Sequence, residues 1–421
     1  MSPPTASGPG PRPALMGRAV MLFVSFLLVI LAYYQVKAAS RSLLLEHGGT
    51  EAFPYVWIGS ALTLLAFIGV YNRLVERLSR LQVVVGSLFA FAAILVAFRV
   101  ALSDGGITTV VAFYIFVDLF SVVLVEQFWS LANSITRLDE GHRSYWFIAT
   151  GGLVGGVAGG LVAAGLLRYT AMHTVDLLLS CAAMLLVTGL VNLAMGRRGA
   201  FVEVAEEPRI PLRGEGLRAV LRNRYLVLIA LVVCLSQLAE PVVEFQFLRA
   251  IAEAFPGTDE RTDFISRFFS VMGFVSIGVN LFVTPAVHRY LGTIAGLAVQ
   301  PVVLAMVTLG YSVKPTLGMA ATMKIADRGL SYSINRASKE ILFIPVDPVL
   351  TFQAKAWIDM LGYRMFKVLG SGLIVAVTAA VPAALVSTDL AWLTLVICAA
   401  WVVAVIMLGV EQRRVLVRAA A

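Results

Sequence analysis

The chain has 421 residues, of which 59% are apolar and 14% are charged, and its mean hydropathy is +0.87. Soluble domains are closer to half apolar and a quarter charged, so the composition excludes that class, together with disordered and disulfide-built proteins. Twelve membrane helices of about 20 residues each would take up about 240 residues, which is close to the apolar share. Three cysteines (Cys181, Cys234 and Cys398) lie in apolar runs without a CxxC pair and are expected to be packing residues.

The apolar runs predict an all-α integral membrane protein with twelve transmembrane helices. Residues 1–17 are rich in Pro, Gly and Ser and predict a disordered tail. The run at 18–34 continues into further apolar chain without a convincing small-residue cleavage site, which favours a first membrane helix over a signal peptide. Runs long enough to span begin near residues 18, 53, 82, 109, 145, 175, 225, 264, 291, 315, 356 and 390.

The net charge of +8 comes from 33 basic and 25 acidic residues. In a soluble chain this excess would suggest nucleic acid, but in a membrane chain it first indicates basic cytoplasmic loops, so no nucleic-acid partner is expected. If the N-terminus is inside, most loop arginines fall on the inner side, and both termini are expected to be cytoplasmic. The predicted domains are a tail at 1–17, a six-helix bundle at 18–195, a cytoplasmic linker at 196–224, a second six-helix bundle at 225–411 and a basic cytoplasmic tail at 412–421.

The two predicted bundles contain similar short segments. Glu51-Ala52-Phe53-Pro54 recurs as Glu253-Ala254-Phe255-Pro256, and Ser134-Ile135-Thr136-Arg137 recurs as Ser333-Ile334-Asn335-Arg336. Six spans per repeat give parallel halves related by an axis along the membrane normal, which is the major-facilitator-like arrangement with a substrate at the midplane between the halves. Accidental repetition in low-complexity membrane sequence is the alternative.

Ionisable residues inside the predicted spans are candidate site residues, because an isolated charge in a bilayer costs several kcal/mol. The first span ends with Lys37 and Arg41, one turn apart, and the seventh carries Glu240 and Glu244 around Pro241. The tenth span carries charges at Lys324, Asp327, Arg328, Arg336, Lys339 and Glu340. In the eleventh span, side chains at four-residue steps form one stripe on a helix face, namely Lys355, Asp359, Tyr363 and Lys367. Arg364 lies beside this stripe.

Lysine usage points in the same direction. Only six of the basic residues are lysines, and five of them lie in or at the ends of spans. A lysine ammonium is a compact charge suited to binding and releasing phosphate, so several cations with a few carboxylates predict a polyanionic small-molecule substrate. Ion pairs that only hold helices together are the alternative.

The remaining motifs indicate packing rather than catalysis. Glycines of the fifth span fall at steps of four in two adjacent rows, which predicts that a neighbouring helix approaches closely there. They are Gly151, Gly152, Gly155, Gly156, Gly159 and Gly160. Four separated histidines without an HExxH pattern predict no metal site, and no nucleophile motif is present, so neither an enzyme nor a cofactor is expected.

Four segments resemble the ATP/ADP antiporters, the nucleotide transporters of plastids and intracellular bacteria, whose relatives also occur in free-living bacteria. The first segment is YYQVKAASR at 33–41, followed by an acidic residue and a proline, Glu51 and Pro54, at the start of the second span. The second segment is FWSLAN at 128–133, followed by DEGHRSY at 139–145. KEILFIPVD at 339–347 is similar to the family's KExxYIPLD. KAWID at 355–359, with Gly362, Arg364, Lys367 and Gly370, is similar to its KAxxDxxGxRxxK…G.

The resemblance implies a twelve-helix major-facilitator-like fold that exchanges ATP or other nucleotides for ADP. It also implies roles in transport for Lys37 (with Arg41 close by), Glu140, Glu240 and Lys367. The seventh-span motif departs from the family's Glu-Val-Thr-Trp-Lys, because Glu244 stands in place of the cation.

The sequence therefore favours a secondary transporter that exchanges nucleotides or related phosphorylated anions across a bacterial inner membrane by alternating access, with the lipid bilayer as surroundings and a monomer as the expected state. The phosphates are expected to be held by cations, and three carboxylates are expected to hold those cations when the site is empty. The cations are Lys37, Arg41, Lys339, Arg364 and Lys367, and the carboxylates are Glu240, Glu244 and Asp359. A proton-coupled transporter of another organic or phosphorylated anion, and a non-transporting scaffold of the same fold, are the alternatives.

Overall fold

The computed structural model describes residues 15–75, 78–103, 105–136, 138–197, 221–346, 350, 354–355, 357–380 and 386–420. The predicted tail at 1–17 lies outside the described residues except for its last three, which begin the first helix. Most of the predicted linker at 196–224 also lies outside them.

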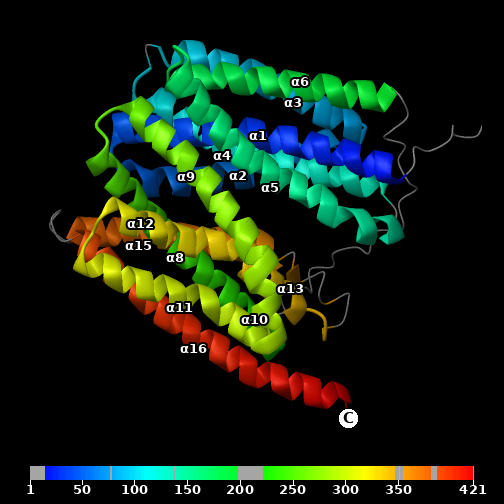
Figure 1. Cartoon of the computed structure of the whole chain (residues 1–421), viewed down its shortest axis with the longest axis vertical. Coiled ribbons are helices and arrows are strands. Elements are labelled where there is room, and N and C mark those ends of the chain that lie inside the picture. The colour runs from blue at the N-terminus through cyan, green and yellow to red at the C-terminus, as the bar shows by residue number, and fades with distance from the viewer. Residues whose placement is uncertain are drawn as a thin grey trace, which may run out of the picture. The chain divides into compact units, whose positions relative to one another are not determined.

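Every regular element in the described part is helical (Figure 1). The first half holds α1 (Leu15–Gly48), α2 (Ala52–Val75), α3 (Arg80–Ala101), α4 (Ile107–Ile135), α5 (Leu138–Tyr169), the 3-10 turn η1 (Thr174–Asp176) and α6 (Leu177–Arg197). The second half begins with α8 (Arg224–Ala254), α9 (Thr258–Gly278), η2 (Val279–Val283), α10 (Thr284–Tyr290) and α11 (Gly292–Val313). It continues with α12 (Leu317–Lys324), η3 (Ile325–Gly329), η4 (Ser331–Asn335), α13 (Arg336–Leu342), η5 (Trp357–Gly362), α15 (Tyr363–Ala380) and α16 (Val386–Ala420).

Ten helical spans in the described residues are long and apolar enough to cross a membrane. The other two predicted spans correspond to α2, whose apolar part is shorter, and to the charged run α12–α13. Apolar side chains also remain exposed along many helices, as a bilayer requires of the surface that it covers. The predicted all-α membrane fold with twelve spans is confirmed.

The chain forms two compact units. The first unit comprises the described residues within 1–41, 63–209 and 262–270, and the second unit those within 42–62, 210–261 and 271–421. Each unit thus takes one short segment from the opposite half of the sequence, namely 42–62 and 262–270. The domain boundaries at 18–195 and 225–411 stay a prediction from the sequence.

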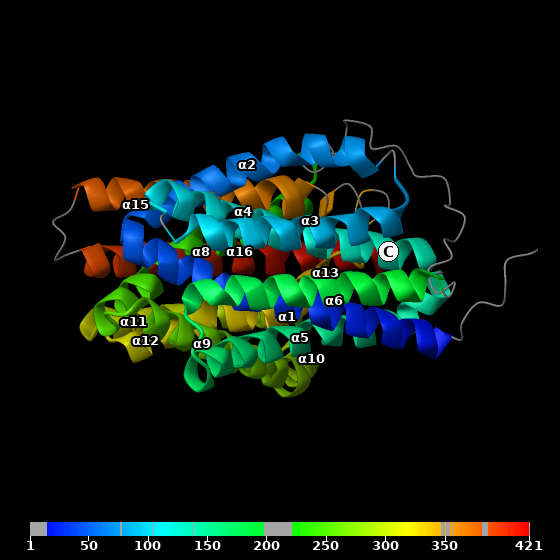
Figure 2. The ribbon, with the colours of Figure 1, turned by 90° about the horizontal axis from the view of Figure 1, so that it is seen from above.

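Close backbone contact between α1 and α5 organises the first unit (Figure 2). A Cβ atom on Gly151 would lie 2.6 Å from the carbonyl oxygen of Phe23. A Cβ atom on Gly155 would lie 2.5 Å from that of Leu27, and one on Gly159 would lie 2.5 Å from that of Leu31. These three glycines are one turn apart, so a whole face of α5 lies against the backbone of α1. The predicted packing role of the glycine rows is confirmed.

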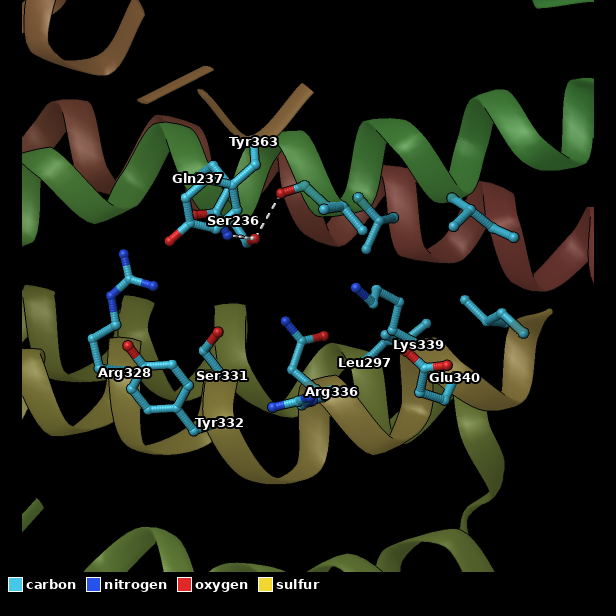
Figure 3. A pocket seen from close by; sticks show the side chains of 15 residues that line it. Ser236, Gln237, Leu297, Arg328, Ser331, Tyr332, Arg336, Lys339, Glu340 and Tyr363 are labelled. Atoms are coloured by element: carbon cyan, nitrogen blue, oxygen red, sulfur yellow. Dashed lines mark hydrogen bonds between the residues drawn. The ribbon is translucent and has the colours of Figure 1, made fainter. Parts of the chain in front are cut away.

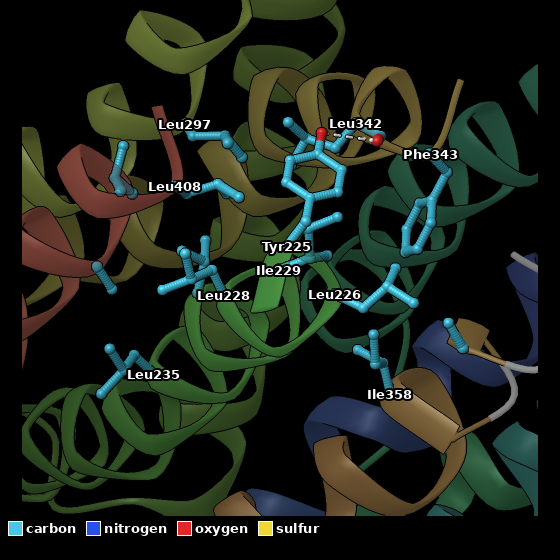
Figure 4. Packing of buried hydrophobic residues seen from close by; sticks show 14 of the residues in the cluster. Tyr225, Leu226, Leu228, Ile229, Leu235, Leu297, Leu342, Phe343, Ile358 and Leu408 are labelled. Atoms are coloured by element: carbon cyan, nitrogen blue, oxygen red, sulfur yellow. Dashed lines mark hydrogen bonds between the residues drawn. The ribbon is translucent and has the colours of Figure 1, made fainter. Parts of the chain in front are cut away.

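The second unit packs α8 against α11 and α16 around a large apolar core, and α15 also contacts α8 (Figure 4). Tyr225 lies at the start of α8, and its hydroxyl donates a hydrogen bond of 2.9 Å to the carbonyl oxygen of Leu342 at the end of α13. Trp401 of α16 is fully buried in the same core. This core fixes α8 and the end of α13, two of the helices that carry the polar residues described below.

We expect Gly155→Ala to destabilise the protein, because the added methyl group would overlap the Leu27 carbonyl oxygen and force α1 away from α5. Overpacking of this kind costs about 1–3 kcal/mol. Gly165→Ala on the same helix is the matched control, since nothing lies within 4 Å of its added Cβ. Thermal unfolding of the purified protein in detergent should give a lower midpoint for the first variant only, and equal midpoints would contradict the close contact.

Candidate functional site

Six ionisable side chains from three helical segments meet inside the second unit. Arg328 of η3 donates from Nη2 to Glu240 Oε1 of α8 at 2.6 Å, and Lys367 Nζ of α15 lies 3.5 Å from the other oxygen of Glu240. One turn further along α8, Glu244 Oε2 lies 2.6 Å from Lys324 Nζ at the end of α12. With Asp327, the group contains three cations and three carboxylates, so its formal charge is zero. We refer to these six residues as the charge cluster.

Asp327 joins the two halves of the charge cluster. Its Oδ2 lies 3.6 Å from Lys324 Nζ and 3.5 Å from Arg328 Nε. The Asp327 side chain is only 2% exposed, and Lys324 is 3% exposed. Burial at this level would be very costly for single charges, and mutual pairing offsets the desolvation cost. Removing one member therefore leaves its partners as uncompensated buried charges.

Two carboxylate oxygens in the cluster are held by charge alone. Glu240 Oε2 and Asp327 Oδ2 are buried and accept no hydrogen bond from the described residues. Their nearest cations lie at 3.5 Å, which is longer than an ordinary hydrogen bond. The cluster is thus neutral in charge but retains capacity to accept further hydrogen bonds.

Local sequence explains how Lys367 reaches Glu240. Pro241 lies inside α8 directly after Glu240, and Gly370 of α15 faces it. A Cβ on Gly370 would lie 2.7 Å from the Leu238 carbonyl oxygen and 3.1 Å from Pro241 Cγ. The absence of a side chain at Gly370 lets α15 approach α8 closely, and Lys367 lies one turn before it on α15.

Two π-helical turns, η3 and η4, interrupt the helix that supplies Lys324, Asp327 and Arg328. Such turns are rare and are often found at functional sites. Gln300 of α11 is fully buried and braces both turns. Its amide nitrogen donates to the Asp327 carbonyl oxygen, and its amide oxygen accepts from Asn335, each at 2.7 Å.

A cavity of about 260 Å³ lies next to the charge cluster, between α8 and the η3–α13 segment (Figure 3). The α8 wall is mainly apolar, with Ser236 and Gln237 as its polar side chains. The opposite wall is polar and basic. It presents Arg328, Ser331, Tyr332, Asn335, Arg336, Lys339 and Glu340. Lys339, predicted as a substrate contact, lines this cavity.

In the first unit, Lys37 is buried among aromatic rings. Its Nζ lies 4.3 Å from the ring centre of Phe269 and 4.5 Å from that of Tyr34. Arg41 lies one turn further on, donates to the Lys37 carbonyl oxygen at 3.1 Å and contacts the Phe269 and Tyr114 rings. Ring faces attract cations, so this pair is stabilised partly by cation–π contact. The structure thus brings the two predicted cations of the first span together.

The other predicted site residues lie elsewhere. Glu140 lies in the first turn of α5, where it accepts from Arg18 at 2.5 Å, and Arg18 also donates to the Ile135 carbonyl oxygen. Arg364 lies in the first turn of α15. The backbone of Asp359 belongs to η5, but its side chain lies outside the described part.

The predicted site set omitted Lys324, Asp327 and Arg328, which prove to be central to the charge cluster. Their charges inside an apolar span were the available signal. Sequence alone could not rank them above the other charges of the tenth span, because their partners Glu240 and Glu244 lie about eighty residues earlier.

We expect Lys324→Met to lower stability by about 3 kcal/mol, because it leaves Glu244 and Asp327 buried without their ammonium partner. Glu244→Gln in the same chain should restore much of the loss, since it removes the uncompensated carboxylate. A double-mutant cycle measured by denaturation of purified protein checks this coupling. Strictly additive losses would show that the two residues do not depend on each other.

Comparisons with solved structures place the fold among membrane transporters. The nucleoside transporter NupG superposes with a TM-score of 0.67 at 12% identity, covering 94% of this chain and 99% of that one. A bacterial homologue of the human lysosomal transporter Spinster, solved inward-facing and unoccupied, gives a TM-score of 0.61 at 12% identity, covering 98% of this chain and 96% of that one. These matches confirm the major-facilitator-like fold and, at such identity, nothing beyond it.

Sequence comparisons are more specific. ADP,ATP carrier protein 1 of Chlamydia muridarum is 27% identical over 339 residues, covering 68% of this chain and 64% of the carrier. ADP,ATP carrier protein 3 of Rickettsia bellii is 22% identical over 317 residues, covering 61% of each. The chain thus spans less than two thirds of the length of these carriers. The family model described as TLC ATP/ADP transporter matches residues 106–412, and the chain belongs to this family.

Proposed function

We propose that the chain exchanges nucleotides of the ATP/ADP type, or related phosphorylated anions, across the bacterial inner membrane by alternating access. Membership of a transporter family makes it a membrane transporter rather than an enzyme. The carriers from Chlamydia and Rickettsia support the choice of nucleotides. The observation that carries the proposal is the neutral charge cluster, in which one carboxylate, Glu240, is shared by two cations beside a basic cavity.

Charge balance suggests how the cluster would respond to an anion. Arg328 and Lys367 both form ion pairs with Glu240. A phosphate group that contacts these cations competes with Glu240 for them, because both offer anionic oxygens to the same donors. Lys367 is the more available cation, since its side chain is 29% exposed and its distance to Glu240 is the longer one.

The same competition would favour exchange over one-way movement. When a phosphate leaves, its cations stay uncompensated until Glu240 or another anion replaces it, and uncompensated buried charge is unfavourable. A second anion that arrives as the first departs avoids that state. We propose that this linkage couples the movement of one nucleotide to the return of another.

The first unit would contribute Lys37 and Arg41 as further phosphate contacts. Both side chains lie over the ring of Phe269, so each cation is held by a neutral partner as well as by its other contacts. Glu140, Glu244, Lys339, Asp359 and Arg364 remain proposed site residues. Arginine-rich loops support cytoplasmic termini in the same proposal.

Proton-coupled transport of another organic or phosphorylated anion is the second candidate. It is favoured by the buried oxygens of Glu240 and Asp327 that accept no hydrogen bond from the described residues, since a carboxyl proton could occupy either position. Such a transporter would respond to a proton gradient and would not require a counter-substrate.

Counterflow in proteoliposomes distinguishes the two candidates. Vesicles loaded with unlabelled ADP should accumulate labelled ATP, whereas empty vesicles should not. Lys367→Gln should lower this uptake about tenfold or more, because it removes a charge-assisted contact with phosphate. Lys314→Gln, at the exposed end of α11, is the matched control and should transport normally.

A folded protein that never accumulates labelled nucleotide, whatever the internal pool, would overturn the nucleotide proposal. Uptake that follows a proton gradient without an internal counter-substrate would favour the second candidate. Undiminished uptake by Lys367→Gln would remove Lys367 from the proposed site.

A further inference from the structure

On the basic side of the cavity, residues at steps of four along the η3–α13 segment line the cavity. An α-helix turns about 100° per residue, so a step of four residues overshoots by about 40° and three such steps drift by about 120°. A π-helical turn contains more residues and drifts the opposite way. Only Leu330 separates η3 from η4, and α13 follows η4 directly, so the drift of the π-helical part is opposed by that of the α-helical part after Arg336.

These lining side chains form two rows along the segment. One row steps by four through Arg328, Tyr332, Arg336 and Glu340, and the neighbouring row through Ser331, Asn335 and Lys339. Figure 3 shows Arg328 near one end of this wall, with Arg336, Lys339 and Glu340 toward the other. Gln300 holds the winding, since it is bonded to both π-helical turns.

The charges on this wall favour anions at a second position. Glu340, the carboxylate that lines the cavity, pairs with Lys355 at 2.5 Å, and Glu240 of the neighbouring charge cluster pairs with Arg328 at 2.6 Å. Arg336 and Lys339 add two further cations to the same wall. The cavity therefore has a cation at the charge cluster and a cationic pair about two turns away.

The volume of the cavity limits what it can hold. At about 260 Å³ it is smaller than the range of about 300–1,000 Å³ that is typical for pockets of drug-sized ligands. A phosphate chain is narrower than a complete nucleotide and carries charge along its length. Arg328 and Arg336 are eight residues apart, which is about 12 Å at most along a helix axis, so two long arginine side chains can reach both ends of such a chain.

We propose that this cavity binds the phosphate chain of the substrate and that Arg336, with Lys339 beside it, contacts phosphates beyond the one near Arg328. Arg336 is then a specificity-determining residue that selects for phosphate-chain length. A single phosphate reaches only one of the two cationic positions, whereas a chain of two or three phosphates reaches both. The inference rests on the proposed transport of phosphorylated anions and assigns residues to it that the predicted site set did not contain.

The test uses inorganic anions, so that the nucleoside plays no part. Binding of phosphate, pyrophosphate and tripolyphosphate to the purified full chain is measured by calorimetry at constant ionic strength. The unmodified protein should bind the three anions with affinity that rises with chain length. Arg336→Gln should weaken pyrophosphate and tripolyphosphate about tenfold or more, the usual effect of losing one charge-assisted hydrogen bond, and should change phosphate less than about twofold.

Two further variants separate a direct contact from a general loss of positive charge. Arg336→Lys keeps the charge and should restore part of the affinity for the longer chains. Arg289→Gln removes an arginine of the same unit that lies over the Tyr290 ring and does not line the cavity, so it should leave all three affinities unchanged.

Equal weakening of all three anions by Arg336→Gln would overturn the inference, because it would indicate only a change in overall electrostatic potential. Failure of every inorganic anion to bind, in a protein that still exchanges nucleotides, would overturn it and leave the proposed function intact. Length-dependent binding that Arg336→Gln abolishes, in a protein that exchanges no nucleotide, would support the phosphate-chain site and reject the proposed nucleotide exchange.

Discussion

The sharing of Glu240 between Arg328 and Lys367 is the interaction on which the second unit depends. Buried charges are tolerated only when they are paired, so this carboxylate ties α8 to η3 and to α15 at one point. Pro241 and Gly370 allow the close approach that the pairing needs. In the proposed function, an anion that binds these cations would compete with Glu240, so the interaction that holds the three segments together would also be the one that responds to substrate.

Glu244 shows how the same constraint accommodates a change in sequence. In the seventh-span motif, Glu244 stands where the ATP/ADP antiporters, which the sequence resembles, have a cation. In the structure Glu244 pairs with Lys324 at 2.6 Å, and Asp327 lies between that pair and Arg328. The cluster as a whole thus reaches zero charge through Lys324 and Asp327, so the departure is compensated within the same group of side chains.

The first unit holds its cations in a different way. Lys37 and Arg41 contact aromatic rings. Glu140, which was expected near the substrate, lies at the start of α5 and accepts a hydrogen bond from Arg18 of α1. Ring faces attract a cation without supplying the full negative charge that a phosphate would have to displace. Aromatic rings are therefore among the contacts of the first unit's two cations, whereas carboxylates hold the cations of the charge cluster.

The sequence by itself determined the membrane class, the twelve spans, the glycine contact surface of α5 and the positions of charge within spans. These features follow from local composition and from side-chain periodicity, which a single segment carries on its own. Tertiary structure alone decided which charges meet, since Glu240 and Arg328 are far apart in the chain and many pairings satisfy the same pattern. It also decided the π-helical turns in the segment that brings Arg328 and Arg336 to one cavity. A π-helical turn shifts the backbone hydrogen bonds by one residue, and here that shift is held by a distant neighbour, Gln300.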